Sequence, residues 1–526
     1  GLNAVRYVMS VAHKVGTRQL AAAVQSRNTC KACAFGTGGQ RGGLHNEHNP
    51  GIEICNKNIQ AQSSDIRSGI PAAIFSDNSI EELRQLSGRQ LEDLGRLQHP
   101  LYKAAGDTHY RIISYQDAIA KIAARMQETQ PQRSFFYSSG RSSNEAAFLL
   151  QLFARVFGTN HVNNCSYYCH QASGVGLQST IGTGTATIQY KDLEQADLIF
   201  VFGANPASNH PRFVKTLIAC RRRGGQVVVV NPAREAGLVR FASPSNFRSM
   251  ILGGVEIASH YIQPHIGGDL AFMQALARCL IDGDSLDRDF IASHCNGFSE
   301  YETFLRQLDW NALCQEAGVS AEEIQAIAEV YQRSQNSVFA WGMGLTHHQR
   351  GVENIEAISN LALLRGMIGA PGRGLLPLRG HSNVQGDRTV GIWEQPTAAF
   401  LDKLGEEFSH HMEVRRLSDP PRPTKPYSEA TWQAILAAGD RVDEHVHHVP
   451  RVDVARDDRV AEERSGLAIE RTQADGGGLR ELAGEHRARP RGRVRGALDL
   501  LDRAEIADGE LADRHGFAST ASGTRR

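Results

Sequence analysis

Cys165 and Cys169 stand four residues apart in the segment NNCSYYCHQASG, and His170 directly follows the second cysteine. A thiolate is a soft ligand for a transition metal, and an imidazole can accept a proton near neutral pH. Taken without further context, Cys169 would be a buried core thiol, as cysteines of large proteins usually are. Only Cys169 has a histidine beside it, so we interpret Cys165 as a structural residue.

More cysteines lie near the start of the chain, with Cys30 and Cys33 in a C-x-x-C pair and Cys55 further on. Two thiolates on one tight turn can grip a single metal centre. Zinc commonly uses two such pairs and an iron–sulfur cluster commonly uses four thiolates, whereas only three early cysteines are present. His45 and His48 in the intervening loop could supply a further ligand. On spacing alone, a cluster, a zinc site and chance all stay open.

The nine cysteines are odd in number and clustered, which argues against a disulfide framework and for metal or redox use of a subset. Four of them fall in helix-like segments and are predicted to be small core residues: Cys220, Cys279, Cys295 and Cys314. The early cysteines are therefore the metal candidates that spacing alone offers.

The segments that must position these residues alternate between apolar strands and helices. Continuous apolar runs at 196–205, 226–233 and 337–344 are predicted as strands, with helical patterns between them. Such runs indicate a parallel sheet covered by helices on both faces. Several strands end in Gly, Asn or Pro before a helix, where open α/β sheets bind nucleotides. His347 and His348 follow one strand end and are predicted to face this cleft without binding a metal, whereas Trp341 is predicted to be core.

Length and charge set broad limits on the protein. At 526 residues the chain is too long for one hydrophobic core. The charges of its 57 basic and 57 acidic side chains cancel, so the net charge gives no reason to expect binding to nucleic acid. No apolar run approaches the roughly 20 residues that span a bilayer, so we expect no membrane insertion. The first residues lack the features of a secretory signal, which predicts a cytoplasmic protein.

Residues 412–526 differ in character from the rest of the chain. No Lys follows Lys425, Arg is abundant, and Phe517 is the only aromatic residue after Trp432. A segment without a sustained apolar period cannot bury enough surface to offset its ordering entropy. We predict a disordered or wrongly framed terminus in preference to an Arg-rich interaction tail.

From about residue 27 to 408 the chain resembles the molybdopterin oxidoreductase family, in its formate dehydrogenase-like branch called oxidoreductase alpha (molybdopterin) subunit, or YdeP-type. The matching stretches include NTCKACAFG, SSGRSSNEA, CSYYCHQASGVGL, ADLIFVFGANPASNHP and LRGHSNVQG, in this order. The resemblance implies a multidomain α/β fold with doubly wound parallel sheets. It divides the chain into an iron–sulfur lobe (1–95), a dinucleotide-binding domain (96–335, helical over 268–335), a second and incomplete pterin-binding domain (336–411) and the atypical tail.

The resemblance also implies an iron–sulfur site. Cys30, Cys33 and Cys55 would hold a [4Fe–4S] cluster, and the family's usual third cysteine is missing near Thr37. Lys57 would lie between the cluster and the pterin, where a cation stabilises added electron density.

At the reacting centre, the resemblance implies that Cys169 ligates molybdenum and that His170 is the catalytic histidine. Arg379 would orient a substrate carboxylate through its guanidinium fork. The cofactor would be molybdenum bis-molybdopterin guanine dinucleotide, with contacts from Arg141, Asn144, Glu145, Gly203, Asn205, Asn231, Arg234, Gly267, Asp269, Gly342, Met343, Gly344 and Gln385.

These roles imply an enzyme that removes two electrons from formate or a similar small acid. Electrons would leave through Lys57 and the cluster to a separate acceptor protein, because the sequence has no nicotinamide fingerprint. One alternative keeps the cofactor with another substrate. A second is a truncated, inactive remnant that only binds a partner, since the family's further, largely β-barrel domain is not recognised in residues 412–526. A third is a zinc-binding structural subunit, which would contain zinc without iron.

Overall fold

The computed structural model of the chain describes residues 2–27, 30, 33, 42–45, 55–243, 249, 253–393, 396–409 and 453–454. The tail predicted to be disordered or wrongly framed, residues 412–526, lies outside these ranges apart from β13 (Asp453–Val454). β13 pairs antiparallel with β10 (Cys295–Asn296). The character of the tail therefore stays a prediction.

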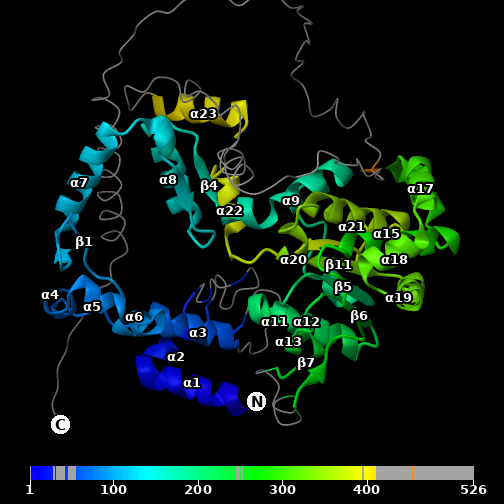
Figure 1. The fold of residues 1–526 in the computed structure, drawn as a ribbon, viewed down its shortest axis with the longest axis horizontal. Helices are drawn as coiled ribbons and strands as arrows, with labels where there is room; N and C mark the ends of the chain where they lie inside the picture. The colour runs from blue at the N-terminus through cyan, green and yellow to red at the C-terminus, as the bar shows by residue number, and fades with distance from the viewer. Residues whose placement is uncertain are drawn as a thin grey trace, which may run out of the picture.

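A five-stranded sheet forms the centre of the described part of the chain (Figure 1). Its order is β12–β11–β5–β6–β9, and every neighbouring pair is parallel. The central strands, with sequences such as LIFVF and QVVVV, are buried on both faces, so polar residues do not alternate along them. The predicted parallel sheet is confirmed, with strands β5 (Leu198–Phe202), β6 (Gln226–Val230), β9 (His260–Ile262), β11 (Ser337–Trp341) and β12 (Gly374–Pro377).

Helices cover both faces of this sheet, because successive strand residues point to opposite sides. Phe200, Phe339 and Trp341 belong to the core of one face, and Trp341 is fully buried as predicted. Ile199 and Val229 belong to the core of the other face, which packs against α12 (Pro211–Arg222). The helices on the first face include α9 (Cys165–Ile181), α15 (Asp269–Asp282), α18 (Trp310–Ala317), α19 (Ala321–Arg333) and α21 (Gly351–Leu364).

The sheet crosses the predicted division between residues 335 and 336, and the division itself stays a prediction. β11 follows this boundary, yet it pairs in parallel with β5 from the preceding segment and with β12 from its own. A buried strand must satisfy its backbone groups on both edges, and β11 does so with one neighbour from each side of the boundary. In the described residues, the segments 96–335 and 336–411 therefore share one sheet and do not form separate ones.

A smaller parallel pair, β3 (Phe136–Ser138) and β4 (Val162–Asn164), lies beside α8 (Asn144–Phe157). The chain returns to this unit after β12. The backbone N–H of Asn383 donates to Gly140 O at 2.8 Å, and the Ser138 hydroxyl donates to the Asp387 carboxylate at 3.3 Å. Residues near 140 and 385 are thus brought together although they are far apart in sequence.

The N-terminal helices α1 (Leu2–Val15), α2 (Thr17–Gln25) and α3 (Asn56–Asp65) enclose a small core of their own, formed by Val11, Val15, Leu20, Val24 and Ile59. Of the predicted core cysteines, Cys220 is fully buried, while Cys279, Cys295 and Cys314 are partly buried against the main core. Within the described ranges, no helix has both the length and the apolar character needed to cross a bilayer.

The other elements are short or peripheral. They are α4 (Ala73–Asp77), α5 (Ile80–Arg84), α6 (Gly88–Leu94), β1 (Leu101–Tyr102), β2 (Arg111–Ile112), α7 (Tyr115–Glu128), the 3-10 turn Pro131–Arg133, α10 (Asp192–Gln195), α11 (Pro206–Asn209), α13 (Ala236–Val239), β7 (Arg240–Phe241), β8 (Val255–Glu256), α16 (Arg288–His294), α17 (Phe298–Gln307), α20 (Met343–Thr346), α22 (Val384–Thr389) and α23 (Ala398–Ser409).

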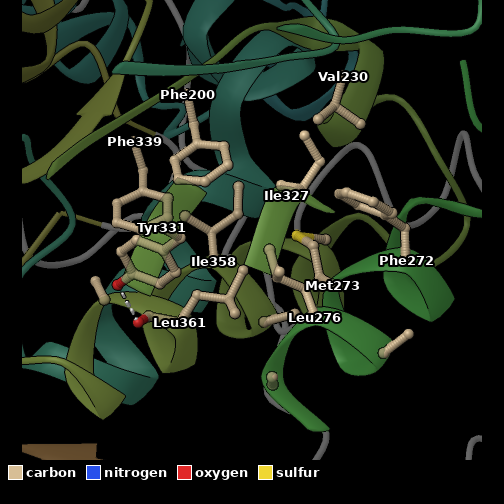
Figure 2. Packing of buried hydrophobic residues seen from close by; sticks show 14 of the residues in the cluster. Phe200, Val230, Phe272, Met273, Leu276, Ile327, Tyr331, Phe339, Ile358 and Leu361 are labelled. Atoms are coloured by element: carbon tan, nitrogen blue, oxygen red, sulfur yellow. Dashed lines mark hydrogen bonds between the residues drawn. The ribbon is translucent and has the colours of Figure 1, made fainter. Parts of the chain in front are cut away.

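An aromatic stack ties the helices of the first face to the sheet (Figure 2). The rings of Phe200 and Phe339 stack with centroids 5.0 Å apart, and Tyr331 of α19 meets both edge-on at 5.5 Å. The buried Tyr331 hydroxyl donates to Leu361 O of α21 at 2.6 Å. This stack therefore fixes the sheet, α19 and α21 relative to one another.

We predict that Phe339→Ala lowers the free energy of unfolding by about 3–5 kcal/mol, because the lost ring leaves a cavity beneath Phe200 and Tyr331. Ile122→Ala in α7 is the control, since Ile122 is 60% exposed and its truncation should change stability by less than about 0.5 kcal/mol. Urea unfolding followed by circular dichroism compares the two variants. Equal losses would contradict the central role of the stack.

Candidate active site

The first turns of α9 carry the two cysteines singled out from the sequence. β4 runs directly into α9, and the side chain of Asn164 caps the helix by accepting the Ser166 N–H at 3.0 Å. Asn164 also donates its side-chain amide to Val384 O at 3.2 Å. Cys165 is the first helical residue, and Cys169 lies one turn later on the same side. The cap therefore fixes the start of α9, and with it the positions of Cys165 and Cys169.

The loop that follows β12 lies along these turns and contacts them residue by residue. Arg379 Nη1 donates to the Ser166 hydroxyl at 2.8 Å. The backbone N–H of Gly380 is hydrogen-bonded to the Cys169 sulfur. Nδ1 of the next residue, His381, lies 3.1 Å from Cys165 Sγ. The loop and the helix thus fix a guanidinium, an imidazole and two sulfurs in one arrangement.

Cys169 is half-buried beside Arg379. Burial is the largest influence on its thiol and, with the neighbouring Cys165, raises its pKa to about 11, although Arg379 and the Gly380 N–H oppose the rise. Burial likewise lowers the pKa of Arg379 to about 10, so this guanidinium stays charged at neutral pH. The Cys169 thiol is therefore protonated near neutral pH, and ligation of a metal would have to displace that proton.

His170, the residue after Cys169, lies in the interior. The residue is 2% exposed, and burial, reinforced by the charge of Arg379, lowers its pKa to about 3. Its Nδ1 lies 3.0 Å from the Ser173 hydroxyl, which also accepts the indole N–H of Trp341 at 2.8 Å. This network holds the imidazole neutral near neutral pH, and the role of His170 as the catalytic histidine stays a prediction.

A cavity of about 640 Å³ lies at the carboxyl ends of β5, β6 and β11, where the sequence predicted a nucleotide site. Many of the predicted cofactor residues line it, together with Lys57 and the expected His348. They are Arg141, Gly203, Asn205, Asn231, Asp269, Gly342, Met343 and Gly344.

Other predicted residues lie elsewhere in the described structure. Asn144 accepts a side-chain hydrogen bond from Asn383 at 2.9 Å, and the guanidinium of Arg234 stacks 5.6 Å over the ring of Tyr261. Glu145 is in the first turn of α8, where the backbone N–H and the Ser143 hydroxyl lower its pKa. Gly267 precedes α15 with φ +88°, and Gln385 belongs to α22. Their contacts in this structure are with the protein itself.

Sequence reasoning missed several residues on the cavity wall, most notably His210, Glu235 and His381. His210 Nε2 lies 2.8 Å from Arg379 O and so supports the loop that carries Arg379. Glu235 accepts the side-chain amide of Asn205 at 2.6 Å. His210 lies between α11 and α12, in the connection that follows β5. Its place in a connection after a strand was the one signal in the sequence that it could line the cavity.

The cavity wall has features of a site for a polar ligand. Gly203 has a positive φ of +49°, which favours glycine. A side chain on Gly344 would also clash, because its Cβ would lie 2.6 Å from Gly203 O. The backbones of the connections after β5 and β11 are therefore in direct contact. Asp269 is 3% exposed, and its Oδ1 has no hydrogen-bond partner among the described residues. A buried carboxylate oxygen without a donor suits a ligand that brings N–H groups, so the wall fits a pterin dinucleotide.

The early cysteines are buried but are not assembled into a metal site. Cys30, Cys33 and Cys55 are 7%, 4% and 8% exposed. Within the described ranges, no three His, Cys, Asp or Glu side chains gather closely enough to hold a metal ion. Burial raises the pKa of Cys55, which the N–H groups of Asn58 and Lys57 oppose. The cluster on these cysteines therefore stays a prediction, and Lys57, two residues after Cys55, lines the cavity.

Comparison with known proteins identifies the family. A family model described as molybdopterin oxidoreductase matches residues 96–421, more than half of the chain. The chain therefore belongs to the molybdopterin oxidoreductase family. Its relatives point to the YdeP-type branch: Protein YdeP of Escherichia coli K12 is 39% identical over 376 residues, which cover 69% of this chain and 49% of that protein. Formate dehydrogenase H of the same strain is 30% identical over 302 residues, covering 56% of this chain and 40% of that protein.

The chain spans about half the length of the curated relatives it matches, such as the 49% of YdeP. Among solved structures, acetylene hydratase from Pelobacter acetylenicus is similar with a TM-score of 0.44 and 17% identity, over 53% of this chain and 37% of that one. A further family model, described as a putative amidoligase enzyme, matches residues 402–454, most of which lie outside the described residues. The family assignment rests on the match over residues 96–421 and implies an oxidoreductase with a molybdenum–pterin cofactor.

We predict that Asp269→Asn stabilises the cofactor-free protein at neutral and alkaline pH. Burial raises the pKa of Asp269 from 3.8 to about 6, so the folded protein holds this proton more tightly than the unfolded chain does. Stability therefore falls as pH rises through that window, and above it the ionised carboxylate costs on the order of 3 kcal/mol.

The measurement is the Tm of both proteins from about pH 4 to about pH 8, with equal values expected at the acid end. Asp289→Asn, an exposed carboxylate in the first turn of α16, is the control and should leave the Tm unchanged. A lower Tm for Asp269→Asn at alkaline pH would contradict the prediction.

Proposed function

We propose that the chain binds molybdenum through bis-molybdopterin guanine dinucleotide and oxidises formate, or a similar small acid, by two electrons. The main support is the position of Arg379, whose guanidinium is held by Ser166 at 2.8 Å next to the Cys169 thiol. A fixed guanidinium beside a soft sulfur ligand is suited to capture a small carboxylate at a metal.

In this proposal Arg379 binds the substrate and Cys169 donates its sulfur to the metal. Arg379 gives one N–H to Ser166 and one from Nη2 to Gly184 O at 3.1 Å, while its buried Nε has no partner among the described residues. Of the five N–H groups on a guanidinium, those left over can grip both oxygens of a carboxylate. The molybdenum cofactor, when bound, supplies the acceptor for the two electrons.

The cavity would hold the dinucleotide part of the cofactor. Lys57 and Arg141 bring positive charge to the wall and would neutralise phosphate groups. Asp269 would accept N–H groups of a base through the oxygen that has no partner in the described structure. The absence of a Cβ at Gly342 and Gly344 lets the backbone approach the ligand closely.

A [4Fe–4S] cluster on Cys30, Cys33 and Cys55 is proposed from the family resemblance of the segments that contain them, since their spacing alone leaves zinc and chance open. Since these thiols are not gathered in the described structure, no electron-transfer step is assigned to a cluster. We propose a separate protein as the physiological acceptor of the two electrons, and a soluble dye replaces it in the assay below.

A second candidate function keeps the cofactor but uses another substrate. The observation that favours it is the burial of His170, which is 2% exposed and so is not presented to a substrate in the manner expected for a formate dehydrogenase-like site. Assays with other small acids separate this candidate from formate oxidation.

We expect the full-length chain, purified anaerobically with molybdenum, to reduce a dye on addition of formate and to release carbon dioxide. Elemental analysis for molybdenum, iron and zinc on the same sample tests the cofactors. Molybdenum-loaded protein without formate turnover would contradict formate as the substrate. Zinc in place of molybdenum and iron would contradict the whole proposal and support a structural zinc subunit.

Cys169→Ala should reduce formate turnover by at least about 100-fold, because the metal loses a protein ligand, while the dinucleotide contacts keep most of the molybdenum bound. Cys314→Ala is the matched control, since Cys314 lies in α18, half-buried against the main core. Turnover and molybdenum content are measured together. Unchanged turnover in Cys169→Ala would remove the ligand assignment.

A further inference from the structure

Cys165 and His381 form a pair that the proposed function leaves unused. The sequence suggested that Cys165 is structural, yet its sulfur lies 3.1 Å from His381 Nδ1, a contact between residues 216 positions apart. The backbone N–H of Gly140 also points at this sulfur and opposes the burial that raises the pKa of Cys165. A Cβ on Gly140 would lie only 2.7 Å from Cys165 Sγ, so the place of the sulfur is closely defined.

His381 extends from this pair to the cavity wall, which it lines together with Arg141. Since Nδ1 faces the sulfur, Nε2 is the ring nitrogen that can face a ligand. Burial and the charge of Arg141 lower the pKa of His381, which leaves a neutral imidazole at neutral pH. The charged or titratable groups around the pair are Arg141 beside the ring and Cys169 and Asp387 near the Cys165 sulfur.

The chain order places this imidazole next to the other reacting groups. Arg379 would hold the carboxylate, Gly380 contacts the Cys169 sulfur, and His381 comes next in the same loop. His170, the alternative base, is 2% exposed and engaged with Ser173 at 3.0 Å. His381 therefore lines the cavity and directly follows the loop residues that contact Ser166 and the Cys169 sulfur.

We propose that His381 is the proton acceptor of the oxidation and that Cys165 is the residue that orients it. This inference rests on the proposed function. Formate would lose the proton of its C–H bond to Nε2 of His381, which would pass it on to solvent, and would leave as carbon dioxide. The molybdenum cofactor, when bound, would supply the acceptor for the two electrons of that bond. Once Nε2 carries the proton, Nδ1–H donates to Cys165 Sγ, which stabilises the imidazolium in the correct orientation.

The first test compares His381→Gln with His170→Gln in the molybdenum-loaded full chain. His381→Gln should lower kcat for formate by at least about 100-fold with a KM changed less than about threefold, because a positioned base acts on the step and not on substrate binding. His170→Gln should lose less. His294→Gln, on an exposed face of α16, is the matched control with wild-type kinetics expected.

The orienting role of Cys165 is tested by a pair of variants. Cys165→Ala should lower kcat about tenfold by removing the partner of Nδ1. Cys165→Ser should restore most of the loss, because a hydroxyl can also accept from Nδ1–H. Equal losses in both variants would overturn this role.

Labelling gives a measurement that does not depend on turnover. Diethyl pyrocarbonate acylates accessible neutral imidazoles, and peptide mass spectrometry of the holoprotein locates the modified histidines. We expect His381 to be labelled and formate to slow that labelling, while the buried His170 stays unlabelled.

The outcomes separate the two proposals. Wild-type protein loaded with molybdenum but inactive on formate would defeat the proposed function, and the proton-acceptor role of His381 with it. Formate turnover in the wild type together with a wild-type kcat in His381→Gln, or with an unlabelled His381, would overturn this inference alone. A large loss in His381→Gln with molybdenum retained and formate-protected labelling would support it.

Discussion

The site depends on one physical constraint, which is the attachment of the loop 379–381 to the first turns of α9. Arg379 donates to Ser166, Gly380 donates to the Cys169 sulfur, and His381 contacts Cys165. Each contact pairs a different loop residue with a different helix residue, so the loop cannot slide along the helix without losing all of them. The spacing between the guanidinium, the imidazole and the sulfurs is therefore fixed by two side-chain contacts and one backbone N–H.

The parallel sheet determines where this attachment can occur. Its strands are apolar on both faces, which leaves the strand ends as the places where polar groups can meet a ligand. β5 and β11 are neighbours, and their following turns touch through Gly203 and Gly344. This contact closes the floor of the cavity, while Asp269 at the start of α15 presents a desolvated carboxylate to it. Burying that group costs stability, which a donor-bearing ligand can offset.

Much of this arrangement could be predicted from the residues themselves. The runs ADLIFVF, QVVVV and SVFAW predicted buried parallel strands, and the Gly and Asn residues after them do line the cavity. These features are local, because strand character and the turn after a strand depend on a few adjacent residues. Sheet membership is not local, since helical residues between two strands do not reveal whether both strands join one sheet, and β11 and β5 join the same sheet across residues 335 and 336.

The features that could not be predicted depend on contacts between distant residues. His170 adjoins Cys169 in sequence, but its surroundings come from Ser173 and Trp341, and their packing made it an interior residue. His381 carried no signal of its own, because its importance arises only when Cys165 and the cavity wall are brought to it. The spacing of Cys30, Cys33 and Cys55 likewise suggested a shared metal, although three buried thiols need not converge.

The distance in sequence between α9 and its loop has a consequence for biosynthesis. Contacts that join residues 213 and 216 positions apart cannot form on a ribosome until the intervening strands β5, β6, β9, β11 and β12 have emerged. Closing such a long segment is slow compared with forming a helix, so α9 exists before its partners arrive. A nascent chain would thus expose the thiols of Cys165 and Cys169 before Arg379 is synthesised. Loading of a metal centre would have to wait until the loop 379–381 packs against α9.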